Sequence, residues 1–279
     1  MAPDSNPKPL PRVCAVSYLN TVPLVWGFLH DPALRGVISL EFALPSVCAD
    51  RLRSGAADIG IIPVIEMARQ NLDYIRGVGI TSDGPVRSIL LFSKVPFNEI
   101  RTLATDVGSR TSVMLSRVIL AEKYGAKPKV FSHPPDLEAM LATHDAALLI
   151  GDAALEVEPS QVPYACLDLG EEWTRMTGLP MVFALWSGKP ERIAEPLGEA
   201  FRASCRYGLA HLDEIVPLEA KRLGYTEQLV RDYFTRYVTF EMTDRHYAGL
   251  QQYLKLATAL DRADGVRYVG DPTAAAIEA

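Results

Sequence analysis

Three hydroxyl side chains and one guanidinium crowd into a single stretch of this chain, Asp106-Val-Gly-Ser-Arg-Thr-Ser112. An extended segment (102–105) precedes it, and the apolar run 113–121 that follows predicts a long amphipathic helix. The first turn of a helix carries unpaired N–H groups and the positive end of the helix dipole, so it can hold a carboxylate or a phosphate. Ser109 or Thr111 could equally cap the helix, and the stretch alone does not decide between capping and binding.

Further polar groups lie at the ends of other predicted strands, where they could join that stretch in one site. The candidates are Ser17, Tyr18, Asn20, Arg87, Ser88, Ser109, Arg110, Thr111, Ser112, Gly151 and Asp152. Each also has an ordinary structural explanation, such as a turn, a satisfied backbone group, a surface ion pair or a helix cap. Their joint position at strand ends favours a binding site for a small anion.

Motifs that would identify several enzyme classes are missing from the sequence. It contains no GxSxG, no P-loop, no GxGxxG followed by an acidic residue and no HExxH, which removes the usual support for a hydrolase, NTPase, dehydrogenase or metalloprotease. The five histidines and four cysteines show no ligand spacing, so we expect no metal and no cofactor.

Charge and composition limit the partners. The 28 basic and 34 acidic residues give a net charge of −6 without long runs, which argues against nucleic acid or an anionic membrane as a partner. A small-molecule ligand is the expected partner, and a homodimer is left open. The scattered cysteines are typical of buried thiols in a reducing compartment. The proline-rich residues 1–11 are expected to form a disordered leader and not a signal peptide, so we expect a cytoplasmic protein.

Strands alternate with helices along most of the chain. The predicted strands are 12–17, 37–43, 58–63, 74–80, 87–93, 102–105, 129–132, 145–150, 164–169 and 180–187. Helical patterns separate most of them, and the segment 191–262 is predicted to be helical, with interruptions at Gly224 and near Asp244. This order predicts an α/β fold with mostly parallel sheets.

Two extended segments suggest that the chain passes between two lobes: Ile89 to Val95 on the way out and Val182 to Trp186 on the way back. The predicted first lobe comprises residues 12–93 and 188–270, and the second comprises 96–182. Two sequential domains divided near residue 190 would leave a helical half without its own core, so we prefer two lobes around a ligand cleft.

Seven short motifs, in this order and at these spacings, resemble the chorismate dehydratase (MqnA) family of the futalosine route to menaquinone. The resemblance covers residues 12–270 and rests on SYLNTVPL (17–24), DIGIIP (58–63), VRSIL (86–90), SRTS (109–112), GDAAL (151–155), LGEEW (169–173) and TGLP (177–180). It implies a type II periplasmic-binding-protein fold and a cofactor-free hydro-lyase that converts chorismate to 3-[(1-carboxyvinyl)oxy]benzoate and water.

The resemblance also implies roles for the candidate residues. The start of the helix at 109–112 would bind one carboxylate of chorismate, and Ser88 with its neighbouring backbone would bind the other. Asn20 would orient the ring or the departing hydroxyl, and Asn20 and Ser88 would be the catalytic residues. Because no side chain is a compelling general base, the enolpyruvyl carboxylate of the substrate is expected to abstract the proton.

Three alternatives share the expected fold. One is the sister enzyme, 1,4-dihydroxy-6-naphthoate synthase, which relies on a histidine, and His133 and His144 are less convincing candidates for that role. Another is a solute-binding protein without catalysis, which would need an export signal. The third, the effector domain of a transcription factor, would need an attached DNA-binding motif.

Overall fold

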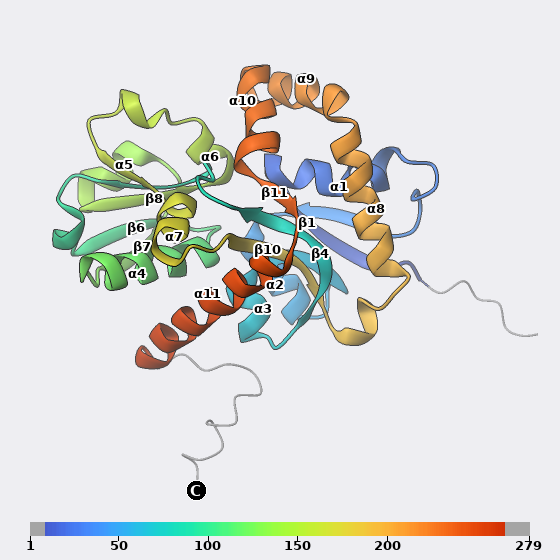
Figure 1. The fold of residues 1–279 in the computed structure, drawn as a ribbon, viewed down its shortest axis with the longest axis horizontal. Helices are drawn as coiled ribbons and strands as arrows, with labels where there is room; N and C mark the ends of the chain where they lie inside the picture. The colour runs from blue at the N-terminus through green and yellow to red at the C-terminus, as the bar shows by residue number, and fades with distance from the viewer. Residues whose placement is uncertain (1–8, 266–279) are drawn as a thin grey trace, which may run out of the picture.

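The computed structural model describes residues 9–265, which form two β-sheets covered by helices (Figure 1). The predicted leader falls mostly on residues 1–8, and the end of the predicted first lobe falls on 266–270; both lie outside the described residues. Within the described part of the chain, no helix is long and apolar enough to cross a membrane.

The first sheet has six strands in the order β11-β4-β10-β3-β1-β2. Their bounds are β1 (Arg12–Val16), β2 (Ser39–Ala43), β3 (Ile59–Pro63), β4 (Asp73–Ser82), β10 (Met181–Gly188) and β11 (Thr239–Glu241). The helices that belong with this sheet are α1 (Val22–His30), α2 (Pro45–Arg53), α3 (Val64–Arg69), α8 (Leu197–Ala210), α9 (Leu212–Leu223), α10 (Glu227–Asp232) and α11 (Asp244–Ala263).

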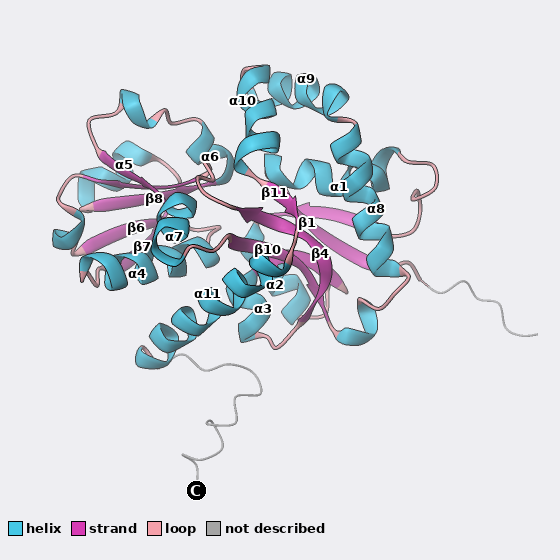
Figure 2. Ribbon diagram, viewed as in Figure 1, coloured by secondary structure: helices cyan, strands magenta, loops and turns pink. Residues whose placement is uncertain are grey.

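The second sheet has five strands in the order β7-β6-β8-β5-β9 and lies on the left of the ribbon view in Figure 2. Its strands are β5 (Ile89–Ser93), β6 (Thr102–Asp106), β7 (Lys129–His133), β8 (Ala146–Ile150) and β9 (Ala165–Asp168). Its helices are α4 (Thr111–Tyr124), α5 (Leu137–Thr143), α6 (Gly151–Leu155) and α7 (Leu169–Thr177). Short helical turns complete the chain: η1 (Leu19–Thr21), η2 (Phe97–Glu99), η3 (Pro159–Gln161), η4 (Pro190–Arg192) and the π-helical η5 (Tyr233–Tyr237).

Both sheets are mixed, so the prediction of mostly parallel sheets is wrong. β1 runs parallel to β2 and β3, but β10 inserts antiparallel between β3 and β4. In the second sheet β6 is parallel to β7 and β8, whereas β5 is antiparallel to β8 and β9. The antiparallel strands β5 and β10 are the first strands that the chain enters after each passage between the sheets, and a single sequence does not reveal their direction.

The chain passes between the sheets at 83–88 and returns at 178–180. The expected crossings at 89–95 and 182–186 are therefore corrected, because 89–93 is strand β5 of the second sheet and 182–186 lies in strand β10 of the first. The buried carboxylate of Asp168 fastens the outgoing crossing. It accepts hydrogen bonds from the backbone N–H groups of Val86 and Arg87 and also caps α7.

One continuous apolar core extends through both sheets, and a smaller cluster lies on the outer face of the second sheet. Strand β6 shows how the faces separate. Leu103 packs into the main core beside α4, and its neighbour Ala104 packs into the smaller cluster with Met140 of α5. This alternation is the two-residue period of a strand that is covered on both faces. The sheets and their helices hold the ends of β1, β5, β6 and β8 around a common space.

Candidate active site

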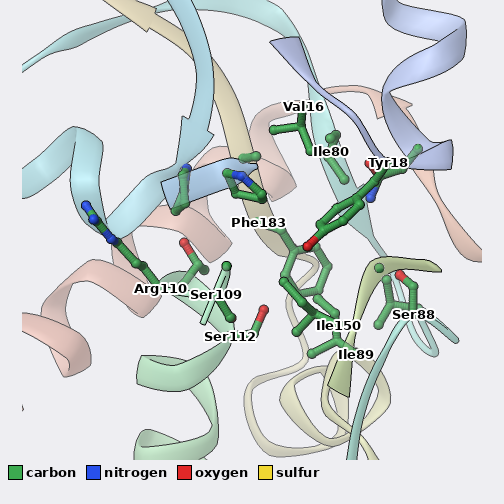
Figure 3. A pocket seen from close by; sticks show the side chains of 18 residues that line it. Val16, Tyr18, Ile80, Ser88, Ile89, Ser109, Arg110, Ser112, Ile150 and Phe183 are labelled. Atoms are coloured by element: carbon green, nitrogen blue, oxygen red, sulfur yellow. The ribbon is translucent and has the colours of Figure 1, made fainter. Parts of the chain in front are cut away.

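A cavity lies between the two sheets, where those strand ends meet, and about 550 Å³ of space within it and at its open mouth is free of protein atoms (Figure 3). Its walls are mostly apolar and its apolar lining residues are Val16, Pro45, Pro63, Ile80, Val86, Ile89, Ile150, Phe183 and Ala184. Polar groups enter from two sides: Ser109, Arg110 and Ser112 from the start of α4, and Ser88 from the opposite side of the view in Figure 3. An apolar space with a few polar groups is the usual form of a small-molecule site.

The start of α4 has more donors than acceptors. The N-cap position of this helix is occupied by Arg110, and its side chain forms no capping hydrogen bond. The Ser109 hydroxyl is buried and has no hydrogen-bond partner among the described residues. Capping is thus excluded as the explanation of Ser109. An uncapped helix start beside an unpaired hydroxyl can accept an anion.

Arg110 and Thr111 line the cavity, but their side chains already contact the first lobe. The Arg110 guanidinium donates to both Asp50 carboxylate oxygens at 3.0 Å and pairs with a Glu66 oxygen at 3.0 Å. The Thr111 hydroxyl lies 3.5 Å from the backbone nitrogen of Ile65. These contacts hold the start of α4 against α2 and α3, and they leave Ser109 and Ser112 as the hydroxyls of this wall that are available to a ligand.

On the other wall, Asn20, Ser88 and Tyr233 form a hydrogen-bonded chain. The Asn20 amide nitrogen donates to the Tyr233 hydroxyl at 3.3 Å, and that hydroxyl donates to the Ser88 oxygen at 2.8 Å. Asn20 and Ser88 line the cavity, as their positions after β1 and before β5 suggested. No pattern in the sequence points to Tyr233, which lies 145 residues after Ser88 in a helical segment.

Tyr18 closes the cavity from the side of the first lobe, with its hydroxyl directed inward (Figure 3). Its ring lies against Gly151, where an added Cβ would come within 2.8 Å of Tyr18 Cδ2. Gly151 also has a φ of +58°, so two independent constraints require glycine there. Burial, together with the nearby carboxylates of Asp106 and Asp152, raises the pKa of Tyr18. Tyr18 is therefore a neutral phenol that can donate a hydrogen bond.

Three predicted residues do not line this cavity. The Ser17 hydroxyl lies 3.4 Å from the carbonyl oxygen of Ala43. Arg87 has a φ of +65°, and its guanidinium donates to the backbone carbonyls of Ala154, within α6, and of Val157, just after it. The Asp152 carboxylate accepts the N–H of Leu19 at 3.0 Å, and burial raises its pKa. Ligand contact by Ser17, Arg87 and Asp152 stays a prediction, and the structure places none of the three in the cavity lining, because proximity to a strand end does not determine where a side chain points.

The lining contains few groups that could move a proton. Among the described residues that line the cavity there is no aspartate, glutamate, histidine, cysteine or lysine. His133 and His144 lie at the edge of the second sheet, with their rings 6.4 Å apart, and do not line it. In residues 9–265 no three histidine, cysteine, aspartate or glutamate side chains are placed to hold a metal ion.

A second hollow lies on the other side of Tyr18. Tyr18 and Val16 line both spaces. The second hollow is bordered by α1 and α9, with Trp26 in its wall and the ion-paired side chains of Glu219 and Arg222 nearby. Trp26 also stacks on His30 of the same helix, with ring centroids 3.8 Å apart.

Comparisons with known proteins agree with this architecture. A family model described as menaquinone biosynthesis matches residues 11–259. The chain is 30% identical over 254 residues to a Thermus thermophilus protein named chorismate dehydratase, and the match covers 85% of this chain and 91% of that protein.

Solved structures give the same fold at lower identity. A structural-genomics protein from Archaeoglobus fulgidus superposes with a TM-score of 0.74 at 18% identity, covering 89% of this chain and 97% of that one. The aliphatic sulphonate binding protein SsuA from Escherichia coli superposes with a TM-score of 0.65 at 17% identity, covering 93% and 89%. The predicted two-lobed periplasmic-binding-protein-like fold is confirmed.

Proposed function

The chain belongs to the menaquinone biosynthesis family, and we propose that it is a chorismate dehydratase, a hydro-lyase that converts chorismate to 3-[(1-carboxyvinyl)oxy]benzoate and water. The T. thermophilus relative supports the activity, and the cavity supports the class of substrate. Chorismate carries two carboxylates on a compact apolar ring system. The cavity offers apolar walls for the ring and polar groups on two sides for the carboxylates.

The observation that carries the proposal is the unpaired Ser109 hydroxyl at the uncapped start of α4, which faces Ser88 and Asn20 across an apolar space. A buried hydroxyl without a partner costs free energy in the empty protein unless a ligand uses it. In this proposal one carboxylate of chorismate binds Ser109, Ser112 and the N–H groups of α4. The other carboxylate binds Ser88.

The reaction needs orientation more than a strong base. The C3 proton and the C4 hydroxyl leave, the electron pair of the C3–H bond forms the C3–C4 double bond, and the ring becomes aromatic. Aromaticity supplies the driving force, so the protein contributes by holding the dianion in a reactive pose. Because the described lining residues include no carboxylate, imidazole or thiol, the enolpyruvyl carboxylate of the substrate takes the C3 proton. The proton leaves with the C4 hydroxyl as water.

Asn20 and the Tyr18 phenol supply neutral donors for the departing hydroxyl. Tyr18 stays protonated because burial raises its pKa, so it can donate without becoming charged. In a cavity with mostly apolar walls, such fixed donors stabilise developing negative charge more strongly than they would in solution.

The test is direct. The purified protein is incubated with chorismate, and the loss of one water is followed by mass spectrometry. Asn20→Ala and Ser88→Ala are each expected to lower turnover by a factor on the order of 100. The control, Ser54→Ala, removes an exposed serine of the first lobe and should keep the wild-type rate.

Each outcome has a clear meaning. Tight binding of chorismate without turnover by the wild type would favour a solute-binding protein. Near-wild-type rates in both the Asn20 and the Ser88 variants would disprove the roles proposed for these two side chains. Circular dichroism checks that each variant is folded.

Three finer features belong to this proposal. The reaction would be the entry step of the futalosine route to menaquinone. The enzyme would work in the cytoplasm, which is in keeping with the buried free thiols of Cys14, Cys48 and Cys205. Analytical ultracentrifugation of the purified protein decides between a monomer and the homodimer that the sequence leaves open.

A further inference from the structure

We propose that Tyr233 is a positioning residue, whose hydroxyl holds the Ser88 side chain so that the Ser88 proton points into the cavity. This inference rests on the proposed function, because it assigns Ser88 as the donor to a substrate carboxylate. Tyr233 does not line the cavity and would act mainly through Ser88, to which it donates, although its hydroxyl also accepts a hydrogen bond from Asn20.

The position of Tyr233 is fixed by its surroundings. Its side chain is 1% exposed, and it begins the π-helical turn η5 that follows α10. Single π-helical turns inside helices occur frequently at functional sites. The strand that follows, β11, pairs with β4 at the edge of the first sheet and anchors this segment. The turn therefore brings a C-terminal side chain to the space between Asn20 and Ser88.

The direction of each hydrogen bond follows from what the groups can donate. The Asn20 amide nitrogen can only donate, so the Tyr233 oxygen is the acceptor of that bond. The single proton of Tyr233 then goes to the Ser88 oxygen, 2.8 Å away. Were Ser88 to donate instead, the phenol proton would be left buried without an acceptor, which is unfavourable.

In this arrangement the Ser88 hydroxyl accepts from Tyr233 and does not donate its own proton to Tyr233 or Asn20. With its oxygen engaged by Tyr233, the Ser88 hydroxyl can turn its own hydrogen toward the cavity, where it would meet an anionic oxygen. Burial raises the pKa of Tyr233, so the phenol remains neutral and keeps its proton on the side of Ser88. Hydrogen bonds in such chains polarise one another, so Ser88 becomes a better donor.

The arrangement also links three distant segments. Asn20 belongs to η1 of the first lobe, Ser88 ends the crossing into the second lobe, and Tyr233 comes from the C-terminal helices. The Ser88 carbonyl additionally accepts the N–H of Gly151 at the start of α6. The side chain of Ser88 is thus held by Tyr233, and its backbone is held by the second lobe.

The experiment compares four proteins in steady-state turnover of chorismate: wild type, Tyr233→Phe, Ser88→Ala and the double variant. Phenylalanine keeps the packing of the ring and removes only the hydroxyl. We expect Tyr233→Phe to lower kcat about tenfold or more, since a bond to a charged group is weakened, while KM changes less. On the Ser88→Ala background the Tyr233 substitution should have a clearly smaller effect, because its acceptor Ser88 is gone and only the contact with Asn20 is left to lose.

Tyr247→Phe is the matched control. It also removes a tyrosine hydroxyl that takes part in a hydrogen bond, here with the N–H of Gly77 at 2.7 Å, far from the cavity lining. It should leave both kcat and KM unchanged. If Tyr247→Phe lowered kcat as much as Tyr233→Phe, the loss would be a general effect of removing a tyrosine hydroxyl and the inference would fail.

The remaining outcomes separate the inference from the proposed function. Wild-type protein that does not convert chorismate overturns both. Wild type that converts chorismate, with Tyr233→Phe equally fast, overturns the inference alone. Additive losses in the double variant, or a Tyr233→Phe protein that fails to fold by near-UV circular dichroism, would show that the role of Tyr233 is structural.

Discussion

Ser109 and Ser116 lie seven residues apart near the start of α4, and their hydroxyls are in opposite states. The Ser116 hydroxyl donates to the carbonyl of Val113 at 2.8 Å, whereas the Ser109 hydroxyl is buried without a partner among the described residues. A hydroxyl that already has a partner contributes to the fold, and a buried one that lacks a partner in the empty protein is available to a ligand. A comparison of Ser109, just before α4, with Ser116, inside it, therefore distinguishes an effect on ligand binding from an effect on stability.

Ser109→Ala should leave the free energy of unfolding unchanged or raise it, because no hydrogen bond is lost. It should weaken the binding of chorismate about tenfold or more, since a hydrogen bond to a charged group contributes about 1.5–3 kcal/mol. Ser116→Ala should lower stability slightly and leave affinity unchanged. Urea denaturation and calorimetric titration measure the two quantities. Equal loss of affinity in both variants would count against an anion site at this helix start.

Prediction from sequence worked at some residues and failed at others for a physical reason. Asn20, Ser88 and Ser109 line the cavity, as their positions near strand and helix ends suggested, whereas Ser17 at the end of β1 lies against the carbonyl of Ala43 instead. Arg87 has a long side chain and a left-handed backbone, so it reaches away to carbonyls near α6. Tyr233 could not have been found, because only the folded chain brings it to Ser88.

At the scale of elements, the site depends on how closely α6 approaches η1. Gly151 begins α6, and the Tyr18 ring occupies the space where its Cβ would be. Gly224, at the C-terminal end of α9, shares the left-handed backbone with a φ of +73° but has nothing within 4 Å of its position. Both glycines are therefore favoured by their left-handed backbone, but only Gly151 is also required because a neighbouring side chain leaves no room for a Cβ.

Gly151→Ala and Gly224→Ala should each lose about 1 kcal/mol of stability from left-handed backbone strain. Only Gly151→Ala should also displace Tyr18 and lower kcat/KM for chorismate. Thermal melts and steady-state kinetics on the two variants test this. Full activity in Gly151→Ala would mean that the position of Tyr18 against α6 is unimportant for turnover.

The strands and helices were largely predictable, and the connections between them were not. The fully buried strand β3 and the helix α4, which ends at Gly125 in a left-handed conformation, follow from local patterns of apolar residues and glycine. The crossings were misplaced because β5 and β10 are apolar strands that look alike whichever sheet they join. The three-residue strand β11 was missed within a helical pattern, because it forms only where β4 offers an edge.

At the scale of the whole molecule, a buried carboxylate connects the two lobes. Glu66 of α3 is 2% exposed and contacts Arg53, Arg69 and Arg110, of which Arg110 belongs to the second lobe. Arg69 also pairs with Asp261 of α11. Burial opposes ionisation of Glu66, but the arginines outweigh it and the pKa of Glu66 is lowered. The ionised carboxylate is thus part of what holds the lobes together.

The sign of the pH dependence follows from that direction. A carboxyl whose pKa is lower in the folded state contributes stability that is complete above its unfolded pKa, about 4.3, and is lost as the pH falls through the folded value. Glu66→Gln should lose about 2 kcal/mol at pH 7 and show a shallower fall of Tm between pH 5 and about pH 3. Calorimetric melts across this range provide the measurement.

Asp213→Asn, at a side chain that is 92% exposed and paired only with Arg231 on the surface, is the control and should follow the wild type. A wild-type acid slope that is retained in Glu66→Gln would assign the acid sensitivity to other carboxyl groups, such as Asp58 and Asp145, whose pKa values are also lowered.

Trp26 gives the protein an optical signal of its own. Trp173 and Trp186 are fully buried in the core, whereas Trp26 lies in the wall of the hollow behind Tyr18 and is stacked on His30. Indole emission responds to the polarity around the ring and to contact with a stacked aromatic ring. A ligand that shifts Tyr18 should therefore change the surroundings of Trp26, one of the three tryptophans. Ligand binding can then be titrated by intrinsic fluorescence without a label.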